Sequence, residues 1–133
     1  MDLEPTRSAY ERLMLRVATE TIGSDADVIS GAPAKDFLAR IEFTSRDQSD
    51  RAAVMNMHTE WLEAVFVLNP NLGVFMLDDF TDADYAAAQV RVMAEVVHAY
   101  LRGEGSMETR RSFLFRRRPQ LRLDVNDREW LAR

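Results

Sequence analysis

The chain has 133 residues and a mass of 15.3 kDa, the size of one typical domain, so we expect residues 1–133 to fold as a single domain. Hydrophobic residues make up 47% and charged residues 29%, close to the globular average, which excludes a disordered tail, a fibre and a coiled-coil rod. The chain has no cysteine and a net charge of −5, which excludes disulfides and thiol chemistry and makes general nucleic-acid binding unfavourable.

An amphipathic helix is predicted over residues 5–22. Its apolar residues recur at helical spacing, Pro5 suits the first turn, and Gly23 suits the position just past the end. The acidic N-terminus lacks the pattern of a signal peptide, and no run of 18 apolar residues follows. We therefore expect no membrane span and a cytoplasmic protein.

Strands and loops should follow this helix. Residues 24–36 are typical of a loop, with a short strand at Val28–Ile29, and residues 37–44 alternate as a strand with one wet face. Residues 51–62 are ambiguous. Their apolar positions fit both a helix beginning near Ser49 or Asp50 and a strand, and we slightly favour the helix.

Residues 63–68 and 73–77 predict a hairpin, because Asn69-Pro70-Asn71-Leu72 between them is rich in turn formers. The stretch 65–68 is continuously apolar, which predicts a strand in the middle of the sheet that is covered on both faces. A long helix is predicted over about 82–102, and Thr81 or Asp82 should cap its N-terminus. It has only a narrow polar stripe, so it should lie deep against the sheet or against a second subunit.

The last third predicts a β-meander over residues 110–132. One strand should run through Arg111, Phe113 and Phe115, with a turn over 117–120 and a tight turn at Asn126-Asp127. Pro119 should lie in a turn or on a sheet edge, because proline cannot donate to the ladder. The predicted fold is α+β, an antiparallel sheet of about five or six strands with two main helices packed on it.

Catalytic and metal-binding motifs are missing from the sequence. His58 and His98 belong to no zinc-enzyme pattern, and we expect His98 to be a solvated histidine on the helix surface. There is no nucleophile elbow and no phosphate loop. We therefore expect no catalytic residues, no cofactor, no metal, and a protein that is not an enzyme.

Charge is distributed unevenly along the chain. Residues 104–133 carry a net charge of +3 and residues 1–103 a net charge of −8, so a basic end adjoins an acidic body. The acidic residues around 78–84 suit the N-terminus of a helix, where the helix dipole favours negative charge. The alternative is that they recognise a basic partner. The candidate partner-binding residues are Arg110, Arg111, Arg116, Arg117, Arg118, Arg122, Asp78 and Asp79.

With residues 51–62 as a strand, the order of elements resembles that of the class I type III secretion chaperones of bacteria. The order also resembles that of small acidic immunity proteins that neutralise secreted bacterial toxins. The chaperone resemblance implies an acidic homodimer formed through the long helix, with an extended partner segment held on the outer surface. Neither resemblance includes a residue motif.

The leading hypothesis is therefore a non-enzymatic module that binds a protein partner, either a toxin or a secreted effector. The first alternative is a small-molecule or enzymatic pocket between the sheet and the long helix, lined by Trp61, Phe66, Phe75 and Tyr100 with His58 as its polar group. The second alternative is nucleic-acid binding through the C-terminal arginines.

Overall fold

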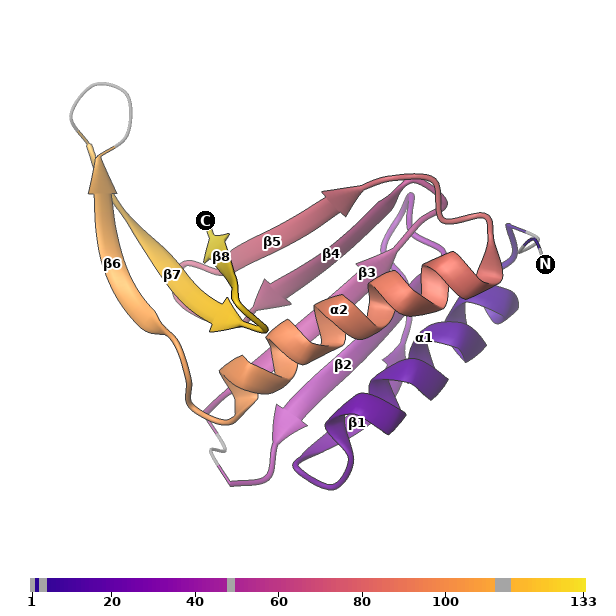
Figure 1. Cartoon of the computed structure of the whole chain (residues 1–133), viewed down its shortest axis with the longest axis horizontal. Coiled ribbons are helices and arrows are strands. Elements are labelled where there is room, and N and C mark those ends of the chain that lie inside the picture. The colour runs from indigo at the N-terminus through magenta and orange to yellow at the C-terminus, as the bar shows by residue number, and fades with distance from the viewer. Residues whose placement is uncertain (1, 3–4, 48–49, 112–115) are drawn as a thin grey trace.

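The computed structural model describes residue 2 and residues 5–47, 50–111 and 116–133, and Figure 1 shows how its helices and strands are arranged. The order of elements is α1 (Arg7–Ile22), β1 (Ala26–Gly31), β2 (Ala39–Ser45), β3 (Ala52–Met57), β4 (Trp61–Phe66), β5 (Leu72–Leu77), α2 (Ala83–Leu101), β6 (Ser106–Arg111), β7 (Arg117–Val125) and β8 (Arg128–Ala132). Strands β1 to β5 form one antiparallel sheet in chain order, and β6 to β8 form a second sheet. The predicted α+β fold is confirmed.

Both helices lie on the same face of the five-stranded sheet, with α1 alongside α2 (Figure 1). The core lies between these two layers and contains residues from every layer, among them Tyr10, Met14, Phe43, Met55, Phe66, Met93 and Val97. The long helix α2 also packs against β7. Because α1, the sheet and β7 cover α2, its broad apolar side is buried within one chain, and a second subunit is not needed to cover it.

Local chemistry explains where the helices begin and end. The Thr6 hydroxyl accepts a hydrogen bond from the backbone N–H of Ala9 at 3.2 Å, so Thr6 caps α1. Gly23 ends α1 with a positive φ of 62°. At the start of α2, a carboxylate oxygen of Asp82 accepts from the N–H of Tyr85 at 2.9 Å. The predicted capping of the long helix is therefore confirmed, with Asp82 as the capping residue.

The helix that we favoured within residues 51–62 is wrong. This stretch forms β3 and the beginning of β4, with a tight connection in which the His58 N–H donates to the Trp61 carbonyl at 2.8 Å. Ala53, Met55 and Met57 are all buried at a spacing of two residues. Pairing with β2 on one side and β4 on the other decides this conformation, because strand formation depends on its cross-strand partners.

The hairpin of β4 and β5 is confirmed, and β4 is an interior strand of the sheet, but the prediction that it is covered on both faces is wrong. The middle strand of the sheet is β3, and β4 lies one position further out. Along β4, Leu62, Ala64 and Phe66 face the core, while the residues between them face away from the helices. Val67, just after the strand, is 44% exposed, so the apolar run is divided: Phe66 packs in the core, whereas Val65 and Val67 do not.

The C-terminal meander is confirmed, but one of its predicted turns is wrong. Residues 117–120, predicted as a turn, lie within β7, and most of the strand predicted from Arg111 to Phe115 lies outside the described residues. Pro119 pairs only with Thr109 of β6, beyond the part of β7 that pairs with β8, which agrees with an edge position. The predicted tight turn is present: Asn126 and Asp127 have φ values of 52° and 61°.

Candidate functional site

One backbone contact joins the two sheets. Gly73 of β5 and Arg133, just after β8, exchange two hydrogen bonds, at 3.2 Å and 3.1 Å. Backbone groups in an antiparallel strand point alternately to the two sides, so the N–H and C=O groups of Phe75 and Leu77 point the same way as those of Gly73. Within the described part of the chain, no partner meets Phe75 or Leu77 on that side. This part of β5 is an open sheet edge.

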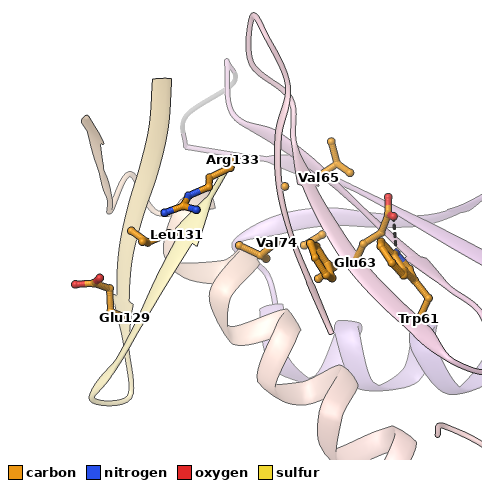
Figure 2. A pocket seen from close by; sticks show the side chains of 10 residues that line it. Trp61, Glu63, Val65, Val74, Glu129, Leu131 and Arg133 are labelled. Carbon is orange, nitrogen blue, oxygen red and sulfur yellow. Dashed lines mark hydrogen bonds between the residues drawn. The ribbon is translucent and has the colours of Figure 1, made fainter. Parts of the chain in front are cut away.

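Beyond the Gly73–Arg133 contact, β5 and β8 diverge. The space between them is a notch lined by side chains of both strands (Figure 2). The notch holds a cavity of about 580 Å³. On the β8 side it is lined by Glu129, Leu131 and Arg133, and on the sheet side by residues of β4 and β5 that include Trp61, Glu63, Val65 and Phe75. The open edge of β5 therefore borders a concave and partly apolar space.

Two stacked aromatic rings form the floor of the notch. The ring centroids of Trp61 and Phe75 are 4.7 Å apart, and the ring planes differ by only 8°. The indole N–H of Trp61 donates to Glu63 Oε1 at 2.6 Å (Figure 2). The other oxygen of Glu63 accepts from Asn56 Nδ2 at 3.1 Å. Asn56 is only 6% exposed. Its buried amide therefore fixes the carboxylate of Glu63, and this carboxylate in turn orients the indole of Trp61.

The exposed apolar surface of the sheet continues from this platform. Phe75 is 58% and Leu77 66% exposed, and both lie on the same face as Trp61. An exposed flat edge bordered by apolar side chains favours pairing with another chain, and proteins usually protect such edges. The opposite edge strand, β1, differs because Asp27 there forms a 2.8 Å ion pair with Arg46.

The predicted acidic residues lie at the end of β5. Asp78 accepts hydrogen bonds from the Tyr85 hydroxyl and from the Asp79 N–H, and the Tyr85 bond is the largest influence lowering the pKa of Asp78. Asp79 accepts from the hydroxyl and the N–H of Thr81, which lowers its pKa. Both carboxylates stay at the surface, where with Glu60 they border a second cavity of about 570 Å³ beside Leu77.

The predicted arginines lie elsewhere. Arg110, Arg111, Arg117 and Arg118 are near the far end of the β6–β7 hairpin, and Arg116 immediately precedes β7. Figure 1 shows this end of the hairpin on the opposite side of the molecule from the connection between β5 and α2. The structure therefore separates the arginines from Asp78 and Asp79. Arg122, nearer the body, lies 3.4 Å from both Glu108 and Glu129.

The pocket predicted between the sheet and the long helix is not formed by its expected residues. Phe66 and Tyr100 pack together in the core with ring centroids 4.7 Å apart, and each is at most 2% exposed. Trp61 and Phe75 lie on the opposite face of the sheet. Successive residues of a strand point to opposite faces of the sheet. The predicted pocket residues were chosen without regard to this alternation, so the structure places them on two different faces.

His98 is not the solvated histidine that we expected. Its side chain is 16% exposed, and Nε2 lies 2.7 Å from an Asp25 carboxylate oxygen. A cavity of about 470 Å³ beside it is lined by Glu20, Arg91 and Glu95 among other residues. These groups already have partners, because Arg91 pairs with Glu20 at 3.2 Å and Asn126 donates to Glu95. This cavity is a weaker candidate than the notch.

The residues that the structure describes contain no group of three or more histidine, aspartate or glutamate side chains that could hold a metal ion. None of the helices in the same residues is long and apolar enough to cross a membrane. Compared with known proteins, the chain matches no family model, no curated protein and no solved structure.

Sequence reasoning missed the notch, although part of the signal was available. The two-residue period of a strand places Trp61, Glu63 and Val65 on one face of β4, and Phe75 and Leu77 on one face of β5. The approach of β8 to Gly73 could not be found in this way, because it joins residues 60 positions apart without any local pattern.

Proposed function

We propose that this protein binds an extended segment of a partner protein in the notch between β5 and β8. The observation that carries the proposal is the open edge of β5 at Phe75 and Leu77, which borders a cavity of about 580 Å³. An extended peptide can add a strand to such an edge. Its main chain then supplies affinity, and pockets for alternate side chains supply specificity.

The geometry of the edge specifies the chemistry of the segment. A residue paired with Phe75 has its side chain on the same face as Phe75, beside the Trp61–Phe75 stack. The next residue on that face lies two positions along, beside Leu77. We therefore expect two apolar side chains separated by one residue.

Charge at the end of β5 defines one flank of the segment. Glu60, Asp78 and Asp79 border the cavity beside Leu77. The stabilised ionised forms of Asp78 and Asp79 suit a lysine or arginine just beyond the second apolar residue. The expected ligand is a short extended segment with alternating apolar residues and a basic end.

An open sheet edge beside a notch is suited to binding an extended segment of a partner more than to binding the surface of a folded partner. Within the protein-binding class, this supports a role like that of a secretion chaperone more than neutralisation of a folded toxin. The order of elements, a helix, strands, a long helix and a meander, is the basis of that resemblance. We do not propose a catalytic activity for the notch.

The test begins with selection of 12-residue peptides from a phage-displayed library on the immobilised protein. Enriched peptides should contain two apolar residues separated by one residue, with a basic residue on one flank of the pair. Residue-resolved amide hydrogen exchange then locates the binding. The N–H groups of Phe75 and Leu77 should exchange rapidly in the free protein and at least tenfold more slowly with peptide bound.

A matched pair of variants separates edge binding from general stickiness. Leu77→Lys places a charge on the open edge of β5, whereas Ile29→Lys makes the same change on β1, at a residue that is 59% exposed. We expect Leu77→Lys to raise Kd at least tenfold and Ile29→Lys to leave it within twofold. Equal effects of the two variants, or slower exchange confined to other strands, would refute the proposal.

A further inference from the structure

The arginine-rich end of the β6–β7 hairpin is separate from the notch and is not explained by it. Two successive cross-strand pairs consist of arginine alone, Arg110 opposite Arg118 and Arg111 opposite Arg117. Like charges directly opposite each other destabilise a β-ribbon. Within the described residues, these four side chains form no ion pair. The hairpin therefore carries repulsive charge that its own folding does not require.

The two pairs lie on opposite faces of the ribbon. Side chains alternate along a strand, so Arg110 and Arg118 share one face and Arg111 and Arg117 share the other. Arg111, Arg117 and Arg118 are exposed, and Arg110 is half-buried with its Nε shielded from solvent and without a hydrogen-bond partner. Positive charge thus projects on both sides of a single two-stranded ribbon.

We propose that this ribbon binds duplex DNA by entering its major groove, with the arginines contacting phosphates on both walls. The major groove of B-form DNA is about 12 Å wide and admits a two-stranded β-ribbon. A flat acidic protein surface would meet only one of the two faces. The deep and narrow major groove of duplex RNA does not admit a ribbon as readily.

The acidic body does not prevent this binding, because the charges are segregated. The net charge of −5 disfavours binding over the whole surface, but the acids at the end of β5 lie on the side of the molecule away from the hairpin end (Figure 1). Repulsion by the body would orient the approach so that the hairpin leads. Contacts of this kind fix position on the duplex and carry no base sequence information.

The salt dependence of binding provides a quantitative test. Neutralising about four phosphates predicts a slope of about −3.6 for log K against log salt concentration, so doubling the salt weakens binding about twelvefold. The probe is a fluorescein-labelled 20-base-pair DNA duplex of mixed sequence. Anisotropy is measured with the full chain over salt concentrations of roughly 25–200 mM.

Three double variants provide the discrimination. Arg111→Gln with Arg117→Gln removes the charge from one face, and Arg110→Gln with Arg118→Gln removes it from the other. Each should halve the slope, since each leaves about two phosphate contacts. Arg12→Gln with Arg16→Gln changes the net charge equally at exposed positions of α1 and should leave the slope unchanged. Circular dichroism checks that every variant is folded.

Several outcomes would overturn the proposal. An unchanged anisotropy at the lowest salt excludes DNA binding, and equal slopes for all three double variants exclude the hairpin as the site. Loss of binding from only one face indicates docking on a flat surface instead. Tighter binding to poly-glutamate, or to vesicles with anionic headgroups, than to the duplex assigns the hairpin to an acidic protein or to a membrane surface.

Discussion

Truncating one phenylalanine on each face of the five-stranded sheet tests the assignment of the two faces. Phe66 of β4 is fully buried and packs against the ring of Tyr100 of α2 in a tilted arrangement. Phe75 of β5 is 58% exposed and stacks on Trp61 at the surface. The same substitution, phenylalanine to alanine, should therefore have very different effects at the two positions.

The magnitudes follow from burial. Phe66→Ala removes a side chain packed on all sides and leaves a cavity, so it should lower the free energy of unfolding by about 3–5 kcal/mol. Phe75→Ala loses the stacking contact and less than half of a side chain's burial, and it leaves no enclosed cavity. We expect it to cost about 1 kcal/mol.

Urea unfolding followed by far-UV circular dichroism measures both values. In a domain of this size, a loss of about 4 kcal/mol lowers Tm by very roughly 10–20 °C, so a thermal scan provides a second measurement. A cost for Phe75→Ala equal to that for Phe66→Ala would refute the assignment of the faces. A cost below about 1 kcal/mol for Phe66→Ala would refute the packing of α2 on the sheet.

Two further predictions concern hydrogen bonds. The backbone hydrogen bond that caps α2 lowers the folded-state pKa of Asp82, so the stabilisation is present above its unfolded pKa of about 3.9 and is lost as pH falls through the lower folded value. Asp82→Ala should therefore lower Tm at pH 7, with a difference from the unaltered protein that shrinks below pH 4, and a constant difference down to pH 2 would contradict this cause. Glu63→Gln should preserve the near-UV circular dichroism of Trp61, because the amide of Asn56 can rotate so that its oxygen accepts from the new glutamine amide. Glu63→Ala should diminish this signal. Equal spectra for the two variants would show that Glu63 does not orient the indole.

Most local structure of this chain follows from its sequence. Helical periodicity and capping residues predict α1 and α2 to within two residues of their observed bounds, because caps satisfy backbone groups through nearby side chains. Turn formers likewise predict the β4–β5 hairpin and the tight turn at Asn126-Asp127.

Residues 51–62 show where local information is insufficient. Their apolar residues fit a helix and a strand almost equally well, and the choice depends on β2, which supplies the paired edge. The same applies to the apolar run at 65–68, because sequence records that these residues are apolar but not whether a second layer covers them.

The candidate sites divide in the same way. The sequence by itself identified the arginines, the two aspartates and the aromatic residues as unusual, because composition and spacing are local properties. Only the tertiary structure separated Phe66 from Phe75, placed the arginines on both faces of one ribbon, and brought Arg133 to Gly73. Each of these facts depends on the pairing and parity of strands, which set the face and the partner of every residue and are decided by contacts between distant parts of the chain.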